Sequence, residues 1–102
     1  MRDGKIRVMV KAPGKDWEPK TIDNTLEALQ QEVGGYIQFV PCYGVAGGGI
    51  LCNEEGRLMG LERNCLVEGV SYCGSIVYIG ARPDREDFED CPEELPEWGE
   101  WG

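Results

Sequence analysis

The segment 53–57, Asn-Glu-Glu-Gly-Arg, is the part of the sequence whose residue types and spacing could support chemistry. Its adjacent carboxylates, Glu54 and Glu55, stand beside Arg57 and could bind a cation or a basic partner. Neighbouring glutamates on a turn usually point apart, however, and a magnesium ion needs further oxygen ligands that the sequence does not identify. The pattern therefore favours a turn with solvated charges. Asn53 in this turn, and Asn64 further along the chain, could instead cap backbone groups.

Histidine and closely paired cysteines, the usual residues of zinc sites and of nucleophilic catalysis, are missing from the sequence. The absence of histidine excludes Ser/His and Cys/His nucleophiles. The cysteines are odd in number and contain no Cys-x-x-Cys pair, which predicts free thiols and no zinc site: Cys42, Cys52, Cys65, Cys73 and Cys91. We therefore expect no metal, no cofactor and no catalytic residue, and the sequence favours a non-enzymatic role.

Two features resemble parts of nucleotide or nucleic-acid sites but lack the residues that such sites need. The glycines 47–49 lead into Ile-Leu-Cys, whereas a phosphate-binding loop requires a lysine and a hydroxyl residue entering a helix. Tyr36, Phe39 and Tyr78 could stack on bases, but the sequence shows no basic patch to neutralise phosphates. We expect no nucleotide site and no direct binding of nucleic acid.

The negative charge is concentrated at the carboxyl end of the chain. Nine of the 19 acidic residues lie within 84–102, where Arg85 is the one basic residue, so this segment carries −8 of the net charge of −9. Two readings are open: a solubilising tail, or a mimic of DNA that inhibits a host defence enzyme. One acid about every 7 Å of extended chain is far sparser than the charges of duplex DNA, about 1.7 Å apart, which favours the solubilising tail.

Trp98 and Trp101 are unusual in so hydrophilic a terminus. Exposed indole rings lower solubility, so these two side chains should either fold back onto the core or anchor a partner. The pattern favours folding back, and it leaves binding open.

The length and the alternation of side chains predict one α+β domain over 1–83, followed by the acidic segment 84–102, partly ordered or docked. We expect one short helix packed on a mixed or mostly antiparallel sheet of four to six strands. No apolar run is long enough to span a bilayer and no signal-peptide core is present, so the expected location is the cytoplasm, with no membrane partner.

The individual elements follow from turn and capping signals. Asn24 and Glu27 have capping-box spacing for a helix that ends at Gly34 and Gly35. The segment 41–49 reads as a mobile glycine-rich loop and 61–73 as a helical turn and loop, while a short helix over 84–90 is plausible. Strands are expected over 5–11, 17–22, 36–40, 50–53, 57–61 and 74–81, with 50–61 forming a hairpin.

In the order of its motifs, the sequence resembles the small proteins grouped as domain of unknown function 3846. The resemblance covers about residues 5–81, and its most specific parts are Cys-Asn-Glu-Glu-Gly-Arg-Leu-Met-Gly-Leu at 52–61 and Gly-Ser-Ile-Val-Tyr-Ile-Gly at 74–80. It implies an origin in phages, plasmids and integrated elements of bacteria, and no established activity.

The first hypothesis for function is an accessory protein of a phage or mobile element that binds a host or element protein without catalysis. The second is a small-ligand binder or enzyme that uses the 53–57 turn near Tyr36, and the third is the DNA mimic. The candidate binding residues are Tyr36, Asn53, Glu54, Glu55, Arg57, Asn64, Trp98 and Trp101.

Overall fold

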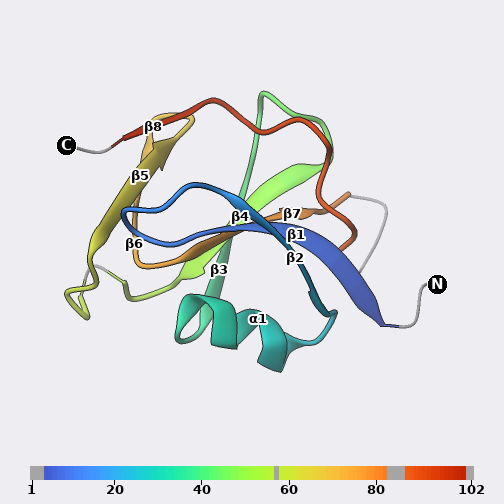
Figure 1. The fold of residues 1–102 in the computed structure, drawn as a ribbon, viewed down its shortest axis with the longest axis horizontal. Coiled ribbons are helices and arrows are strands. Elements are labelled where there is room, and N and C mark those ends of the chain that lie inside the picture. The colour runs from blue at the N-terminus through green and yellow to red at the C-terminus, as the bar shows by residue number, and fades with distance from the viewer. Residues whose placement is uncertain (1–3, 57, 83–86, 101–102) are drawn as a thin grey trace.

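The computed structural model describes residues 4–56, 58–82 and 87–100, and these form one α-helix and eight β-strands (Figure 1). The elements in chain order are β1 (Lys5–Lys11), β2 (Glu18–Asp23), α1 (Leu26–Val33), β3 (Ile37–Pro41), β4 (Gly48–Asn53), β5 (Arg63–Val67), β6 (Val70–Cys73), β7 (Ile76–Gly80) and β8 (Trp98–Glu100). The α+β class is confirmed in outline, but the described residues hold more strand than the sequence predicted.

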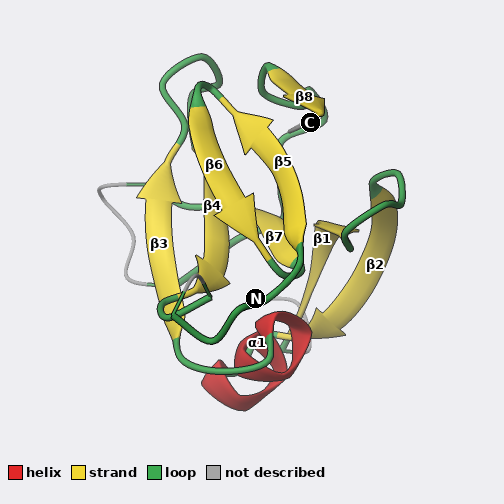
Figure 2. Ribbon diagram, turned by 90° about the vertical axis from the view of Figure 1, so that its left-hand side faces the viewer, coloured by secondary structure: helices red, strands yellow, loops and turns green. Residues whose placement is uncertain are grey.

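The strands form two antiparallel sheets where a single sheet was expected. The larger sheet has the order β2-β1-β7-β4-β3, and the smaller one has the order β6-β5-β8. Figure 2 shows α1 at one end of the molecule and the β5–β6 hairpin in front of the larger sheet. The expected range of four to six strands fits the larger sheet, and the three-stranded sheet is additional.

Both faces of the larger sheet are covered, so its central strands are buried throughout. On β7, Val77 and Ile79 belong to the core cluster that includes Leu29 of α1. Ile76 and Tyr78, which alternate with them, pack in a second cluster with residues of the smaller sheet. The sheet is thus a middle layer between the helix and the smaller sheet.

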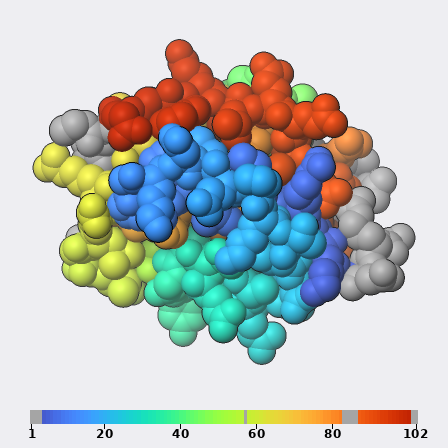
Figure 3. All heavy atoms as spheres, viewed as in Figure 1, coloured from blue at the N-terminus to red at the C-terminus, as the bar shows by residue number. Residues whose placement is uncertain are grey.

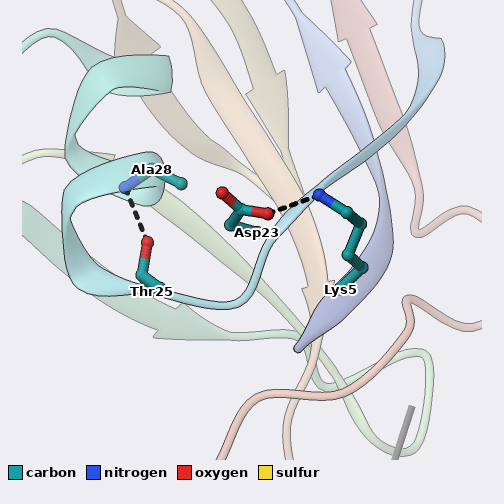
Figure 4. Close-up of polar contacts among 4 residues, drawn as sticks. All are labelled: Lys5, Asp23, Thr25 and Ala28. Carbon is teal, nitrogen blue, oxygen red and sulfur yellow. Dashed lines mark hydrogen bonds and ion pairs between the residues drawn. The ribbon is translucent and has the colours of Figure 1, made fainter. Parts of the chain in front are cut away.

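The ends of α1 are capped, but the amino-terminal cap is not the residue that we expected. Thr25 has an extended backbone and its Oγ1 accepts a hydrogen bond from the Ala28 amide at 3.2 Å (Figure 4). Asn24 lies one residue too early, and its Nδ2 donates to the Phe88 carbonyl oxygen at 3.0 Å. The predicted end of the helix is confirmed, since Gly34 adopts a left-handed conformation with φ of 77°.

The start of β1 is held to the end of β2 by both backbone and side chains. Lys5 and Asp23 are register partners in the β1–β2 ladder, and their side chains form an exposed ion pair (Figure 4). This pair lies just before the helix cap, where the chain leaves the sheet to begin α1.

The glycine-rich segment 41–49, expected to be a mobile loop, is a loop only over 42–47, because Pro41 ends β3 and Gly48 begins β4. Gly48 and Gly49 are buried and begin β4. A Cβ atom on Gly48 would lie 2.8 Å from Tyr78 Oη, and one on Gly49 would overlap the Phe39 ring. These glycines therefore allow close approach of aromatic rings to the strand.

The predicted hairpin of 50–61 is wrong, because residues 54–56 and 58–60 form turns instead of the start of a return strand. The expectation of a helical turn and loop over 61–73 is also wrong. This stretch is the β5–β6 hairpin, with Glu68 and Gly69 at φ of 50° and 82°. Positive φ at both central residues is typical of the tightest hairpin turns, which match the twist of the strands.

Residues 87–100 pack along the core, and the helix considered for 84–90 is not found in its described part, 87–90. Phe88 packs against the helix-side cluster, while Cys91, Leu95 and Trp98 belong to the other cluster. Figure 3 shows this segment, in orange and red, lying across the molecule beside the blue β1–β2 region. Its last strand, β8, pairs with β5.

Among the described residues, no helix has the length and apolar character to cross a membrane.

Candidate functional site

A groove follows the seam where the β3–β4 side of the larger sheet meets β6. Its larger hollow has a volume of about 200 Å³ and is lined by Gln38 and Val40 of β3, Cys52 of β4 and Tyr72 of β6, among others. A smaller hollow of about 50 Å³ shares Val40, Val70 and Tyr72 with it and adds Cys42, Tyr43 and Glu68. We call the two together the seam groove.

Large apolar side chains stand exposed along the seam groove. Leu58 is 87% exposed and Val70 is 43% exposed, and both line the larger hollow. Tyr43, at 89% exposed, lines the smaller one. The groove therefore has an apolar floor of Val40 and Tyr72 and apolar projections at its rim.

The turn that the sequence singled out contributes carboxylates to this rim. Glu54 and Glu55 are exposed and line the larger hollow, together with Asn53. Tyr36, in contrast, is 70% exposed and is not among the lining residues; its carbonyl oxygen accepts the Glu54 amide at 2.8 Å. The ligand hypothesis required the carboxylates and the Tyr36 ring to converge in one pocket, and the geometry does not bring them together.

Asn53 ties the turn to the end of the helix. It is 6% exposed, and its Oδ1 accepts the Glu55 amide at 2.8 Å while its Nδ2 donates to the Val33 carbonyl oxygen at 3.3 Å. A Cβ on Gly35 would lie 2.7 Å from that Nδ2, so the glycine makes room for the amide group. Asn53 thus caps backbone groups, as one of the two readings of this residue proposed.

Asn64 of β5 is the centre of a buried polar cluster that joins Lys11 of β1 to Gly74, the residue after β6. Its Nδ2 donates to the carbonyl oxygens of Lys11 and Gly74, both at 2.8 Å, and its Oδ1 accepts from Lys11 Nζ at 3.0 Å. Lys11 is 1% exposed. The amide therefore satisfies a strand carbonyl, a turn carbonyl and an interior ammonium group at once.

Trp98 closes this cluster from the carboxyl-terminal segment. Its ring lies 5.5 Å from Lys11 Nζ and meets the Trp17 ring edge-on, with the ring centroids 6.1 Å apart. A cation over an indole face is attracted to the ring electrons. Trp98 is therefore folded back onto the core. Lys11 is too enclosed to react with a solute, so we assign the cluster to stability.

Two thiols that line the groove, those of Cys42 and Cys52, are poor nucleophiles at neutral pH. Burial, with a further contribution from the charge of Glu68, raises the pKa of Cys42 to about 11. Burial also raises the pKa of Cys52 and of the Tyr72 hydroxyl. Since the thiolate is the reactive form, these groups stay protonated and unreactive. All five cysteines are free, and no group of three possible metal ligands of the His, Cys, Asp or Glu type forms among the described residues.

Two of the predicted site residues, Arg57 and Trp101, lie outside the described residues. Sequence reasoning missed Val70 and Tyr72, because the 61–73 stretch was not read as a hairpin, and it missed Leu58, because 57–61 was read as a strand. The signal was present in Val-Glu-Gly-Val at 67–70, where two β-branched residues flank a glycine-containing two-residue turn. It also missed Lys11, because alternation assigned that side chain to a face that was expected to be solvated.

The comparison with protein-family models gives one match, to a family described as a domain of unknown function (DUF3846), over residues 6–100. The match extends beyond the 5–81 span expected from the motifs and includes β8. No curated protein and no solved structure matches the chain.

Proposed function

The chain belongs to the DUF3846 family, and we propose that it is a non-enzymatic protein-binding module whose seam groove receives a partner protein. The partner is a protein of the bacterial host or of the phage or mobile element that encodes the chain, in the cytoplasm. The exposure of Leu58, Val70 and Tyr43 along one groove is the observation that carries the proposal.

Covering these side chains would release a substantial free energy. Removal of apolar surface from water is worth about 25 cal/mol per Å², and exposed apolar groups gathered along a concave surface are typical of interaction sites. Leu26 of α1 is also 59% exposed, but it lies outside the groove. A single exposed apolar residue is ordinary on protein surfaces, whereas three along one groove favour a partner.

The charges near the groove favour a basic partner. Glu54 and Glu55 are exposed at one end of it. Glu68, at the other end, accepts hydrogen bonds from the Tyr43 and Gly44 amides at 2.8 and 2.7 Å, which hold its side chain in a fixed position. With a net charge of −9 on the whole chain, a positively charged segment would be attracted over several ångströms.

The two other hypotheses receive less support. The ligand or enzyme reading needs Tyr36 in the groove, where it is not found, and burial raises the pKa of the Cys42 and Cys52 thiols. The DNA-mimic reading needs carboxylates that are free to face an enzyme. In the carboxyl-terminal segment, Glu89 pairs with Arg82 at 3.4 Å and Asp90 accepts the Arg7 amide at 2.8 Å.

The test is affinity capture from bacterial lysate with three versions of the full chain. The first is the natural sequence, the second carries Leu58→Ser and Val70→Thr, and the third carries Leu26→Ser as a matched control. We expect proteins that are retained by the natural chain and by the Leu26→Ser variant but are lost from the groove variant. Retention of the same proteins by all three would contradict the proposal.

A further inference from the structure

The strand β3 lies at the outer edge of the larger sheet, since it pairs with β4 and is last in the order β2-β1-β7-β4-β3. Its open side borders the seam groove, to which Gln38 and Val40 contribute side chains. An open strand edge carries backbone donors and acceptors in a row, ready to pair with another strand.

The alternation of hydrogen bonds along the β3–β4 ladder identifies which backbone groups of β3 point away from β4. The Cys42 amide donates to the Gly48 carbonyl oxygen at 3.0 Å, and the Glu54 amide donates to that of Tyr36 at 2.8 Å. In an antiparallel pair every second residue turns its backbone groups toward the partner. The backbone N–H and C=O groups of the even-numbered residues in β3 therefore point toward β4. Those of Ile37, Phe39 and Pro41 point away from it, toward the open edge.

These outward groups have no partner within the described residues. No hydrogen bond there involves the amides of Ile37 and Phe39 or the carbonyl oxygens of Ile37, Phe39 and Pro41. Pro41 has no N–H, and proline in a sheet is tolerated where that position faces away from the ladder, which agrees with this alternation.

We infer that the partner in the proposed function binds by strand addition: an extended segment of another protein pairs with β3 and extends the larger sheet. The inference rests on the proposed function and specifies its mode. Side chains on one face of the added strand would lie beside Val40 and enter the seam groove, while those on the other face would cover Phe39, whose ring is 38% exposed. One added strand would thus use both the open backbone groups and the exposed apolar ones.

The chemistry of the added segment follows from these neighbours. Alternate positions should be apolar, because they enter the groove. Lysine or arginine should flank them, opposite Glu54 and Glu55. A second copy of this chain is a poorer occupant, because two chains of net charge −9 repel each other.

The test begins with a library of random short peptides, selected against the immobilised full chain. The selected peptides should alternate apolar residues with lysine or arginine. Their affinity is then measured for two variants, Phe39→Ala and Phe39→Pro. Both remove the ring, but only proline also removes the outward N–H. We expect Phe39→Pro to bind about tenfold more weakly than Phe39→Ala, the equivalent of one hydrogen bond.

Amide hydrogen exchange on the natural chain gives a second readout, which holds even if Phe39→Pro fails to fold. The Ile37 and Phe39 amides should become protected when the peptide is added. Equal affinities for the two variants, together with unchanged exchange at these amides, would overturn the inference, as would a library that gives no binding peptide. So would a dimer of the free chain that Phe39→Pro dissociates.

The outcomes also separate this inference from the proposed function. Suppose that a peptide no longer binds the chain with Leu58→Ser and Val70→Thr, but does not protect the Ile37 and Phe39 amides from exchange. That result would contradict strand addition and would leave the groove as the binding surface. A peptide whose affinity is unchanged by that double variant and by Phe39→Pro would contradict strand addition and the proposed function alike.

Discussion

The buried cluster around Lys11 and the seam groove each hold side chains in the environment opposite to their usual one. Lys11 and Asn64 are polar and enclosed, whereas Leu58 and Val70 are apolar and exposed. The interior pair is satisfied by its own hydrogen bonds and by the Trp98 ring. Among the described residues, no side chain buries Leu58 or Val70 in a comparable way. The comparison separates a structural role, where the unusual groups are already partnered, from a binding role, where they are not.

The largest expected effect comes from breaking the interior cluster with Asn64→Leu. The change leaves Lys11 Nζ and the carbonyl oxygens of Lys11 and Gly74 buried without their partner. A buried donor or acceptor that loses its partner costs about 1–3 kcal/mol, and more when it is charged, so the total is a large part of the stability of a small domain. Urea denaturation of the natural chain and of Asn64→Leu measures this loss in the free energy of unfolding. A loss below about 1 kcal/mol would show that the cluster is not structural.

A smaller loss of stability is expected for Trp98→Ala, which uncovers Lys11 and removes the edge-on contact with Trp17. We expect a decrease of about 2 kcal/mol in the free energy of unfolding, from lost packing and the lost cation–ring attraction. Trp98→Phe, which keeps a ring, should recover part of it. If both variants unfold like the natural chain, then the carboxyl-terminal segment contributes little to the core.

A pH-dependent change in stability is expected from Cys42, which lines the seam groove. The Cys42 thiol has its pKa raised from an ordinary 9.0 to about 11 in the folded chain. The folded state therefore holds this proton more tightly than the unfolded chain, and the resulting stability is complete below pH 9 and is lost as the pH rises through 11. Denaturation of the natural chain and of Cys42→Ala at pH 8, 9, 10 and 11 should show a steeper alkaline loss for the natural chain. Parallel curves would contradict it.

The smallest effect on stability is expected for the seam groove itself. Leu58→Ser with Val70→Thr replaces exposed apolar groups, so the free energy of unfolding should change by less than about 0.5 kcal/mol. Thermal unfolding, monitored by circular dichroism beside the Leu26→Ser control, measures this. A loss of several kcal/mol would mean that these side chains support the fold and would weaken their assignment to binding.

The sequence predicted those features that depend on local patterns. Alternation identified β1, and Gly34 identified the end of α1, because each depends on neighbours along the chain. The family was also predicted from its ordered motifs. The helix start was missed by one residue because Asn24 is engaged by Phe88, a contact 64 residues away along the chain.

The remaining errors arise from contacts between distant parts of the chain. Alternation assigns Lys11 to the face opposite Val8, but it does not reveal that a second sheet covers that face. Glycine content cannot distinguish a mobile loop from a strand approached by Phe39 and Tyr78. The candidate site was predicted in part: Glu54 and Glu55 do line the groove, while Leu58 and Val70 join them only through the fold.

The affinity of the full chain for a selected peptide, measured by isothermal titration calorimetry, is the decisive measurement for the seam groove. The natural chain is compared with the variant that carries Leu58→Ser and Val70→Thr and with Leu26→Ser. We expect the groove variant to bind at least tenfold more weakly, which corresponds to about 1.4 kcal/mol, and Leu26→Ser to bind like the natural chain. Equal affinity for all three chains would contradict the assignment of the seam groove as the binding surface.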